Sequence, residues 1–322
     1  MALVLSAPCL GRAAEQKNGG LSGAVGVDGS STVFPITEAV AEEFHQRHPH
    51  LRVMVGIAGT GGGFERFVRG ETDINDASRP IKESEAAQAA KNAIAFIELP
   101  VAFDGLTVVT NRENDFVDFL TVEELRKIWQ PGSTVKKWSD VRPGWPDRPL
   151  KLYGPGTDSG TFDYFTEAVN GKAGACRADF SASEDDNVLV QGVAGDRDAL
   201  GYFGYAYYVA NSARLRVVPV DGGAGPVTPS EATINDGTYR PLSRPLFIYV
   251  SESAAKRPEV EEFVRFYLAS AAALAKEVGY TPLPDEIYGL ALDRFRKRRA
   301  GSAFLGKATV GLSLKDVLAR EK

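Results

Sequence analysis

The sequence predicts an α/β protein built from two lobes. Short apolar segments alternate with amphipathic helical segments from about residue 24 onwards, an order that is typical of parallel sheets with crossover helices. The chain has 322 residues, which is enough for two domains. A strongly apolar segment at residues 245–250 follows the second group of strands and helices, and we expect it to return the chain to the first lobe.

The composition is that of an ordinary folded protein without a strong charge. Hydrophobic residues make up 43% of the chain and charged residues 25%. The 37 basic and 42 acidic side chains give a formal net charge of −5, so there is no broad basic field for nucleic acid or for an acidic membrane surface. We therefore expect no nucleic-acid partner.

Residues 1–23 are expected to precede the fold as an export signal or a flexible tail. Residues 1–10 form a short apolar run, and the small residues 11–14 after it suit signal-peptidase cleavage, although a basic start is missing. Cys9 directly follows a proline, which is unfavourable for lipid attachment. Export predicts a periplasmic or other extracytoplasmic location. Cleavage would leave Cys176 as the remaining cysteine, so the mature chain would have no internal disulfide.

Lobe 1 is predicted to comprise residues 24–103 and 245–322, and its first part contains three strand–turn–helix units. Apolar side chains recur at helical spacing, as at Ile36, Val40 and Phe44. The units are strand 24–27 with a helix ended by Pro49, strand 51–55 with a helix after the glycine-rich turn 59–63, and strand 73–77 with a helix from Arg79-Pro80 to Ala90. Strands 94–100 and 106–110 follow, and we expect a tight connection at 102–105 to carry the chain to lobe 2.

Lobe 2 is predicted to comprise residues 104–244. Thr121 and Glu124 have the spacing of a capping box, which predicts a helix that ends at Trp129. The other predicted elements are strand 150–153, a helix with Phe162, Phe165 and Val169 on one face, and strands 200–205 and 216–220. The return strand and the amphipathic helix after it, around residues 260–267, are expected to pack on lobe 1. Two chain crossings between the lobes would then form a hinge.

Four short runs at strand-to-helix junctions are rich in hydroxyl side chains and glycine. They are Gly29–Thr32, Gly59–Gly63, Ala77–Pro80 and Gly156–Thr161. The start of a helix presents unpaired backbone N–H groups and a partial positive charge, so such a run can hold an anion. Taken alone, each run is at least as often a turn or a helix cap. Together, in two halves of the chain, they predict an oxyanion held between two lobes.

These four runs, with Ser183–Asn187 and Gly279–Pro284, resemble in order and spacing the phosphate-binding proteins of ABC transporters. The resemblance covers the chain from residue 24 to about residue 290. It implies a type II periplasmic-binding fold whose two lobes close on one inorganic phosphate. It also implies a monomeric binding protein that delivers its ligand to an ABC permease, without enzymatic activity, cofactor or metal.

The resemblance carries nine phosphate-binding positions to this chain. They are Ser31, Thr32, Thr60, Gly61, Ser78, Arg79, Ser159, Gly160 and Thr161. The enterobacterial members of the family have a carboxylate where this chain has Ser78 and an arginine where it has Pro155. We expect Arg79 to supply the positive charge instead, as in the branch of the family with this Ser-Arg-Pro run.

Selectivity for phosphate requires an acceptor as well as donors. Phosphate at neutral pH keeps one or two protons, so an ionised carboxylate would accept a hydrogen bond from it and repel fully ionised sulfate. Asp76, Asp104 and Asp158 are the candidates. Asp158 lies inside a donor run and Asp76 shortly precedes Ser78, so these two are favoured, and the choice between them stays open.

Three other functions stay open. The ligand would be another tetrahedral oxyanion, such as arsenate, sulfate or molybdate, if the site is less selective. The run at residues 158–160 is similar to a serine-hydrolase loop, but a hydrolase needs a base, and the three histidines all lie within residues 45–50 of the other lobe. A proline among these histidines and the lack of a nearby cysteine also argue against a metal site. A phosphate sensor or adhesion protein would share the same fold and site.

Overall fold

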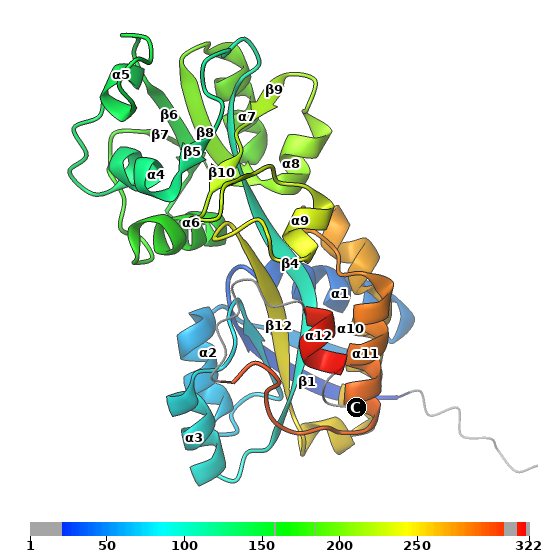
Figure 1. Ribbon diagram of the computed structural model, residues 1–322. Helices are drawn as coiled ribbons and strands as arrows, with labels where there is room; N and C mark the ends of the chain where they lie inside the picture. Colours follow the sequence, from blue (N-terminus) through cyan, green and yellow to red (C-terminus); the bar gives the residue numbers. More distant parts are fainter. Residues whose placement is uncertain (1–20, 158, 184, 306–313, 320–322) are drawn as a thin grey trace, which may run out of the picture.

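Two strands carry the chain between a lower lobe, lobe 1, and an upper lobe, lobe 2 (Figure 1). The computed structural model describes residues 21–157, 159–183, 185–305 and 314–319. Strand β4 (Phe96–Asn111) pairs antiparallel with β12 (Ser243–Ser251) up to Gly105 and with β8 (Ala199–Gly204) from Leu106 onwards. This change of partner within one strand marks the passage between the lobes. The predicted α/β fold with two lobes and two crossings is confirmed.

Three parallel strands of lobe 1 confirm the predicted alternation of strands and helices. They are β1 (Gly23–Gly29), β2 (Leu51–Val55) and β3 (Ile74–Ala77), and the sheet order continues as β2-β1-β3-β12-β4. Strand β12 joins this group antiparallel to β3. The segment predicted at 245–250 therefore does return to lobe 1, where its apolar side chains are fully buried.

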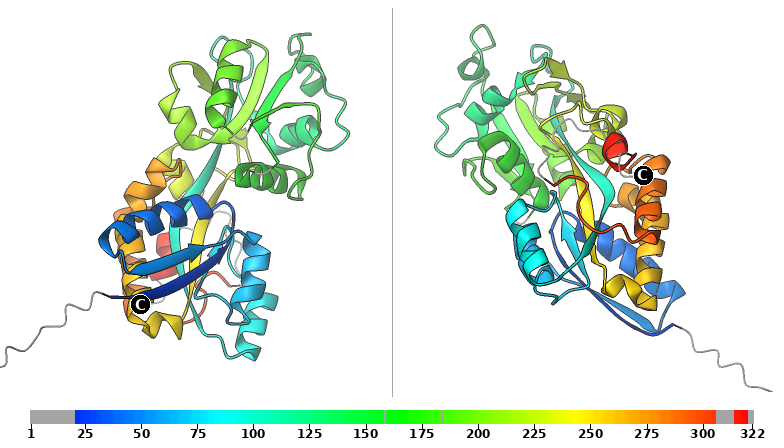
Figure 2. Two further views of the ribbon diagram at one scale, coloured as in Figure 1. Left: turned by 180° about the vertical axis from the view of Figure 1, so that it is seen from behind. Right: turned by 60° about the horizontal axis from the view of Figure 1, so that its bottom comes forward.

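Helices cover both faces of the lobe 1 sheet (Figure 2). They are α1 (Phe34–Arg47), α2 (Gly59–Phe67), α3 (Glu83–Lys91), the short 3-10 helix η1 (Ala254–Lys256), α10 (Pro258–Glu277), α11 (Asp285–Arg296) and α12 (Leu314–Ala319). The ring of Phe44 in α1 lies 5.3 Å from that of Phe263 in α10, and the ring of Phe64 in α2 lies 4.9 Å from that of Tyr249 in β12. These contacts confirm that the helix after the return strand packs on lobe 1.

Among the described residues, lobe 2 combines the upper half of β4 with further strands of the same sheet, a small separate sheet and six helices. Its strands are β8, β6 (Lys151–Pro155), β7 (Ser181–Ser183), β9 (Leu215–Val217) and a small group of β5 (Leu120–Thr121), β10 (Val220–Asp221) and β11 (Pro226–Val227). Its helices are α4 (Val122–Trp129), α5 (Trp138–Val141), α6 (Gly160–Asn170), α7 (Asp186–Gly195), α8 (Tyr205–Ala210) and α9 (Glu231–Asn235). Trp129, Phe165 and Tyr202 form the centre of its aromatic core, in which the last two rings stack at 3.6 Å.

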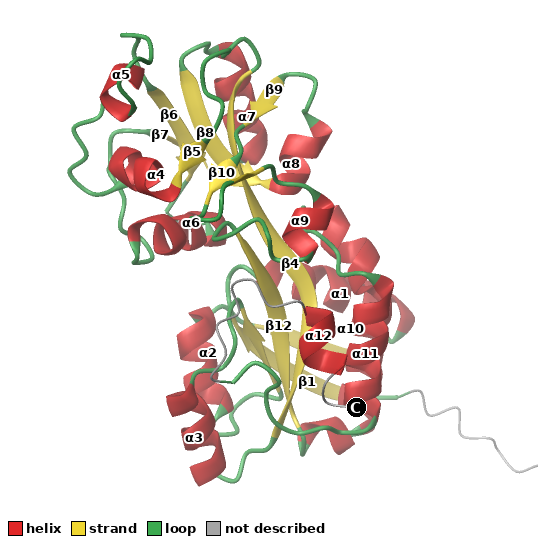
Figure 3. Ribbon diagram, viewed as in Figure 1, coloured by secondary structure: helices red, strands yellow, loops and turns green. Residues whose placement is uncertain are grey.

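The crossing lies at the predicted place, where β4 changes partner after Gly105, but the predicted tight connection at 102–105 is wrong because β4 runs unbroken through these residues (Figure 3). Gly105 reads as a turn residue in the sequence, yet its missing side chain leaves room for Ile234 of α9. Pairing with β12 and then with β8 satisfies the backbone groups along both halves of the strand. The crossing is therefore a continuous strand, and the sheet hydrogen bonds extend through it.

Two predicted helix starts also differ from the structure. The glycine run 59–63 is the first part of α2 itself, and Gly63 within it lies so close to Gly29 and Asn75 that a side chain there would collide with them. Helix α3 begins at Glu83, after Arg79-Pro80, because Glu85 accepts a hydrogen bond from the backbone N–H of Lys82 at 2.8 Å and so fixes the first turn there.

The lobe boundaries proposed from the sequence stay a prediction, since β4 and β12 belong to both lobes. The predicted export signal or tail falls almost entirely on residues 1–20, which lie outside the described residues. Among the helices that the structure does describe, none has the length and apolar character needed to cross a membrane.

Candidate functional site

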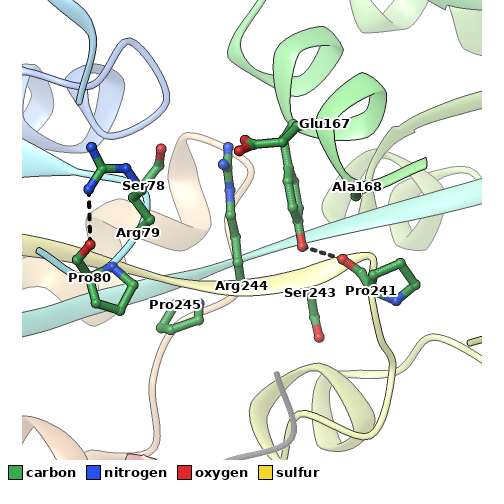
Figure 4. A pocket seen from close by; sticks show the side chains of 10 residues that line it. Ser78, Arg79, Pro80, Glu167, Ala168, Pro241, Ser243, Arg244 and Pro245 are labelled. Atoms are coloured by element: carbon green, nitrogen blue, oxygen red, sulfur yellow. Dashed lines mark hydrogen bonds between the residues drawn. The ribbon is translucent and has the colours of Figure 1, made fainter. Parts of the chain in front are cut away.

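A cavity of about 150 Å³ lies between the lobes and is lined from both of them. Lobe 1 contributes Ser30–Thr32, Gly59-Thr60 and Ser78-Arg79, and α6 contributes Asp163, Tyr164 and Glu167. A neighbouring cavity of about 200 Å³ shares Ser78, Arg79 and residues of α6 with it, so the two form parts of one cleft (Figure 4). Three of the four predicted runs therefore meet helix α6, which follows the fourth.

The first run is held in place by its own backbone and by β3. The N–H of Ser30 donates to the carbonyl oxygen of Asp76 at 3.0 Å, and the hydroxyl of Ser30 accepts from the N–H of Thr32 at 3.2 Å. Helix α1 begins two residues later, at Phe34. Ser31 and Thr32 thus lie at a helix start and line the cavity, as predicted.

The second and third runs touch each other. The hydroxyl oxygens of Thr60 and Ser78 lie 3.1 Å apart, and the N–H of Ser78 donates to the Thr60 hydroxyl at 3.2 Å. Hydroxyls act as donors and as acceptors, so this pair can adapt to an oxyanion with or without protons. Gly61, predicted with Thr60, is absent from the described lining of the cleft.

Arg79 lines the cleft, but its guanidinium is already engaged. It donates to both carboxylate oxygens of Glu85, at 2.7 and 2.9 Å, and to the carbonyl oxygen of Pro80 at 3.1 Å. Such a two-pronged pair is a strong charge-assisted contact that fixes the side chain. The predicted cation is therefore present in the cleft with most of its charge balanced by a neighbour.

Arg244 is a second cation in the cleft, and the sequence interpretation missed it. It projects from the start of β12, and its guanidinium donates to the Thr32 hydroxyl at 3.2 Å and to Asp104 at 3.4 Å. It also lies 3.7 Å from the ring centre of Tyr164. The available signal was a charged residue directly before the apolar return strand, at the second crossing.

Asp104 is the buried partner of Arg244. Asp104 is 2% exposed; burial raises the pKa of Asp104, and the neighbouring Arg244 acts in the opposite direction. The contact of Arg244 with Asp104, at 3.4 Å, is longer than the two contacts of Arg79 with Glu85, at 2.7 and 2.9 Å. The guanidinium of Arg244 is therefore held less tightly by its carboxylate partner than that of Arg79.

The fourth run brings the two lobes into contact. The hydroxyl of Ser159 accepts from the N–H of Thr161 at 3.2 Å and caps α6. Gly160 lies against Thr32, so closely that a β-carbon on it would stand 2.5 Å from the Thr32 hydroxyl oxygen. Among the described residues, the cleft is lined from α6 by Asp163, Tyr164 and Glu167. It is not lined by Ser159, Gly160 or Thr161.

Of the two favoured acceptors, the structure describes Asp76 alone. Asp158 lies outside the described residues. Asp76 is fully buried beside Thr37 and does not line the cleft, although its carbonyl oxygen accepts from the N–H of Ser30, which does. Burial raises the pKa of Asp76 from its ordinary value of 3.8 to about 8; the hydroxyl of Thr37 opposes this rise, and the nearby Asp28 adds to it. The carboxylates that do line the cleft are the exposed Asp163 and Glu167.

The chain is similar to known proteins in sequence and in fold. Residues 14–271 match the family model described as the PBP superfamily domain. The chain is 50% identical over 303 residues to Protein SphX of Synechocystis, which covers 93% of this chain and 90% of that protein. It is 40% identical to the phosphate-binding protein PstS of Staphylococcus aureus strain USA300, and the match covers 91% of this chain and 88% of that protein.

One solved structure is similar to this chain over nearly the whole length of that structure. It is described as a possible phosphate binding protein from Planctomyces limnophilus, shares 50% of its sequence with this chain and superposes with a TM-score of 0.83. The match covers 87% of this chain and 99% of that one. With the family match and the two-lobed fold, these similarities show that the chain belongs to the PstS-like phosphate-binding proteins of the type II periplasmic-binding superfamily.

Proposed function

We propose that this protein is an extracytoplasmic binding protein that captures inorganic phosphate between its lobes and delivers it to an ABC permease. The observation that carries this proposal is the meeting of three hydroxyl-rich loops, a helix of lobe 2 and Arg244 around one small cavity. A volume of about 150 Å³ suits a compact oxyanion. The names of the relatives, which describe phosphate binding, support the same ligand.

The proposed ligand groups divide into two sets. Ser31, Thr32, Thr60 and Ser78 would give hydroxyl and backbone hydrogen bonds from lobe 1, and Arg244 would add charge from the crossing. Gly61, Ser159, Gly160 and Thr161 would add backbone N–H groups from helix starts if the anion lies deeper than the described lining. We propose that Arg79 also contacts the phosphate, through the side of its guanidinium that does not face Glu85.

The net charge supports capture by local groups, because a formal charge of −5 gives no long-range attraction for an anion. Asp163 and Glu167 at the cleft add negative charge close to the site. We propose that such carboxylates favour a protonated phosphate over fully ionised sulfate, since the former can donate to them. Asp158 stays a proposed acceptor of the same kind.

Calorimetric titration with phosphate, arsenate, sulfate and molybdate tests the proposed ligand. We expect one phosphate bound per chain, similar or weaker binding of arsenate, and binding of sulfate weaker by at least about a hundredfold. Tighter binding of sulfate or molybdate than of phosphate would replace phosphate as the ligand. Absence of binding to all four anions would contradict the proposal as a whole.

We also propose that the protein has no enzymatic activity. Ser159 uses its hydroxyl to cap α6, and the three histidines lie in and directly after α1 in lobe 1. A nucleophilic serine needs a base within hydrogen-bond reach. Purified protein is therefore expected not to turn over a chromogenic phosphate ester; turnover that disappears in Ser159→Ala would contradict this. The monomeric state is likewise a proposal, tested by light scattering.

A further inference from the structure

Another cavity, separate from the cleft, lies beside the strands that join the lobes, and its volume is about 350 Å³. Helices α8 and α9 of lobe 2 line it from above, and the end of α10 with the loop after it, Lys276 and Tyr280–Pro282, lines it from below. Figure 1 shows these elements on the right of β4 and β12, whereas α2 and α6, which border the first cleft, lie on the left. We call this second space the hinge cavity.

Strand β4 separates the hinge cavity from the cleft. Asp104 directs its carboxylate to Arg244 in the cleft, and the next residue, Gly105, leaves room for Ile234 of α9 on the other side. Successive residues of a strand face opposite sides of a sheet, so the two spaces lie on opposite faces of the crossing. Phe103, one residue earlier, exchanges backbone hydrogen bonds of 2.8 and 3.0 Å with Thr281 and so fixes the lower wall of the cavity to the same strand.

The run Gly279–Pro284 is a motif that the anion cleft leaves unexplained, and it forms this lower wall. Tyr280 belongs to this wall, and burial raises its pKa. The next residue, Thr281, pairs with Phe103, which directly precedes Asp104 in β4. The lower wall of the hinge cavity is therefore fixed to the strand that carries the carboxylate partner of Arg244.

The lining indicates the kind of molecule that would fit. Tyr205, Ala206, Val209 and Pro282 give apolar and aromatic surface, and Val209 is 50% exposed. The exposed Lys276 also lines the cavity and brings a positive charge to its rim. Glu231, at the start of α9, can accept from a hydroxyl or amine. Small-molecule sites typically combine an apolar wall with a few polar groups in this way.

The position of the hinge cavity couples it to the cleft. In the described conformation the lobes touch at Gly160 and Thr32, on the cleft side. A rotation about β4 and β12 that parts these residues would bring α8 towards Lys276 and Tyr280 on the opposite side and reduce the hinge cavity. A molecule in this cavity would oppose that rotation.

We propose that the hinge cavity is a second binding site, for a small aromatic amphiphile with an anionic end, and that its occupation favours the conformation in which the cleft is closed. The coupling to phosphate rests on the proposed function. Because coupling between two sites is reciprocal, phosphate and the amphiphile would each raise the affinity of the other.

The test uses the full chain and the probe 8-anilinonaphthalene-1-sulfonate, followed by its fluorescence. We expect one saturable site whose affinity rises about fivefold or more when phosphate is present. The variant Ala206→Trp fills the cavity and should lose probe binding while it slows phosphate release several-fold. Ala87→Trp, on an exposed position of α3, is the matched control and should change neither.

Several results would overturn the proposal. Unchanged probe binding in Ala206→Trp would place the probe elsewhere, and probe affinity independent of phosphate would remove the coupling. If circular dichroism shows that Ala206→Trp is misfolded, Lys276→Glu takes its place and should weaken probe binding about tenfold without affecting the thermal transition. If wild-type protein binds no phosphate, the proposed function fails, but the proposed second site does not fail with it. The same variants then still test probe binding in the hinge cavity. The effect of the probe on lobe closure is then tested by whether the probe lowers the radius of gyration.

Discussion

At the scale of single residues, the two arginines of the cleft differ in what holds them. Arg79 forms a two-pronged pair with Glu85, at 2.7 and 2.9 Å. Arg244 faces Asp104 at 3.4 Å, and burial raises the pKa of that carboxyl group. An anion entering the cleft would compete with a strong contact at Arg79 and with a weaker one at Arg244. Arg244 is therefore the better source of positive charge.

Arg244→Ala is expected to weaken phosphate binding more than Arg79→Ala does. A hydrogen bond to a charged group contributes about 1.5–3 kcal/mol, which corresponds to a roughly ten- to 150-fold rise in Kd. Calorimetric titration of both variants measures the difference, and Arg244→Lys, which keeps the charge without the planar fork, should fall between wild type and alanine. A larger loss in Arg79→Ala would show that Glu85 releases Arg79 to the ligand.

Asp76 gives a pH dependence of stability whose sign follows from its raised pKa. The folded protein holds this proton up to a pH of about 8, whereas the unfolded chain releases it near 3.8. The folded state therefore binds more protons in this range, and the contribution of Asp76 to stability falls as the pH rises from about 4 to about 8.

We expect the thermal midpoint of wild type to fall more steeply between about pH 5 and pH 8 than that of Asp76→Asn, which cannot ionise. Other buried carboxyl groups, such as Glu98 and Asp104, are present in both proteins and cancel in the difference. Scanning calorimetry in phosphate-free buffers provides the measurement. Parallel pH profiles of the two proteins would mean that Asp76 is ionised in the fold.

At the scale of elements, the start of α6 decides how closely the lobes approach. Gly160 lies against Thr32 with no space for a β-carbon. Gly160→Ala should therefore hold the lobes apart and weaken phosphate binding by about tenfold, in line with the cost of overpacking a tight contact. Gly289→Ala in α11, where a β-carbon meets open space, is the control and should bind as wild type does. Equal titration curves for both variants would contradict a closed contact at Gly160.

The elements that the sequence predicted well are those fixed by neighbouring residues. Helix α4 has its predicted limits because the Thr121 hydroxyl and the Glu124 carboxylate cap it within four residues, with hydrogen bonds of 3.1 and 2.9 Å. The three runs of lobe 1 meet because parallel strands place the helix starts that follow them at one edge of a sheet. These parts of the fold and of the site were predictable.

The parts that the sequence did not predict depend on distant contacts. Arg244 and Thr32 are 212 residues apart, so no local spacing links them. The pair of Arg79 and Glu85 is only six residues apart, but it forms because α3 begins after Pro80, which the proline alone did not indicate. Gly105 suggested a turn because its contact with Ile234, which requires a glycine within a strand, belongs to another part of the chain.

At the scale of the whole molecule, the lobes share two strands and a small number of side-chain contacts across the cleft. Arg244 contacts both Thr32 and Tyr164, and Gly160 meets Thr32. Bringing polar loops together removes water from them, and these contacts offset only part of that cost. A ligand that accepts hydrogen bonds from both sides would supply the remainder.

Phosphate is therefore expected to shift the molecule from open to closed forms. Small-angle scattering of wild type should show a radius of gyration that decreases on addition of phosphate, and Gly160→Ala should show a smaller decrease at saturation because its lobes cannot meet. The hinge itself is a pair of hydrogen-bonded strands, so the motion would be a bend of β4 and β12 near Gly105 with the sheet of each lobe unchanged. A radius of gyration that stays constant while calorimetry shows phosphate bound would mean that the lobes are already in contact before the anion enters.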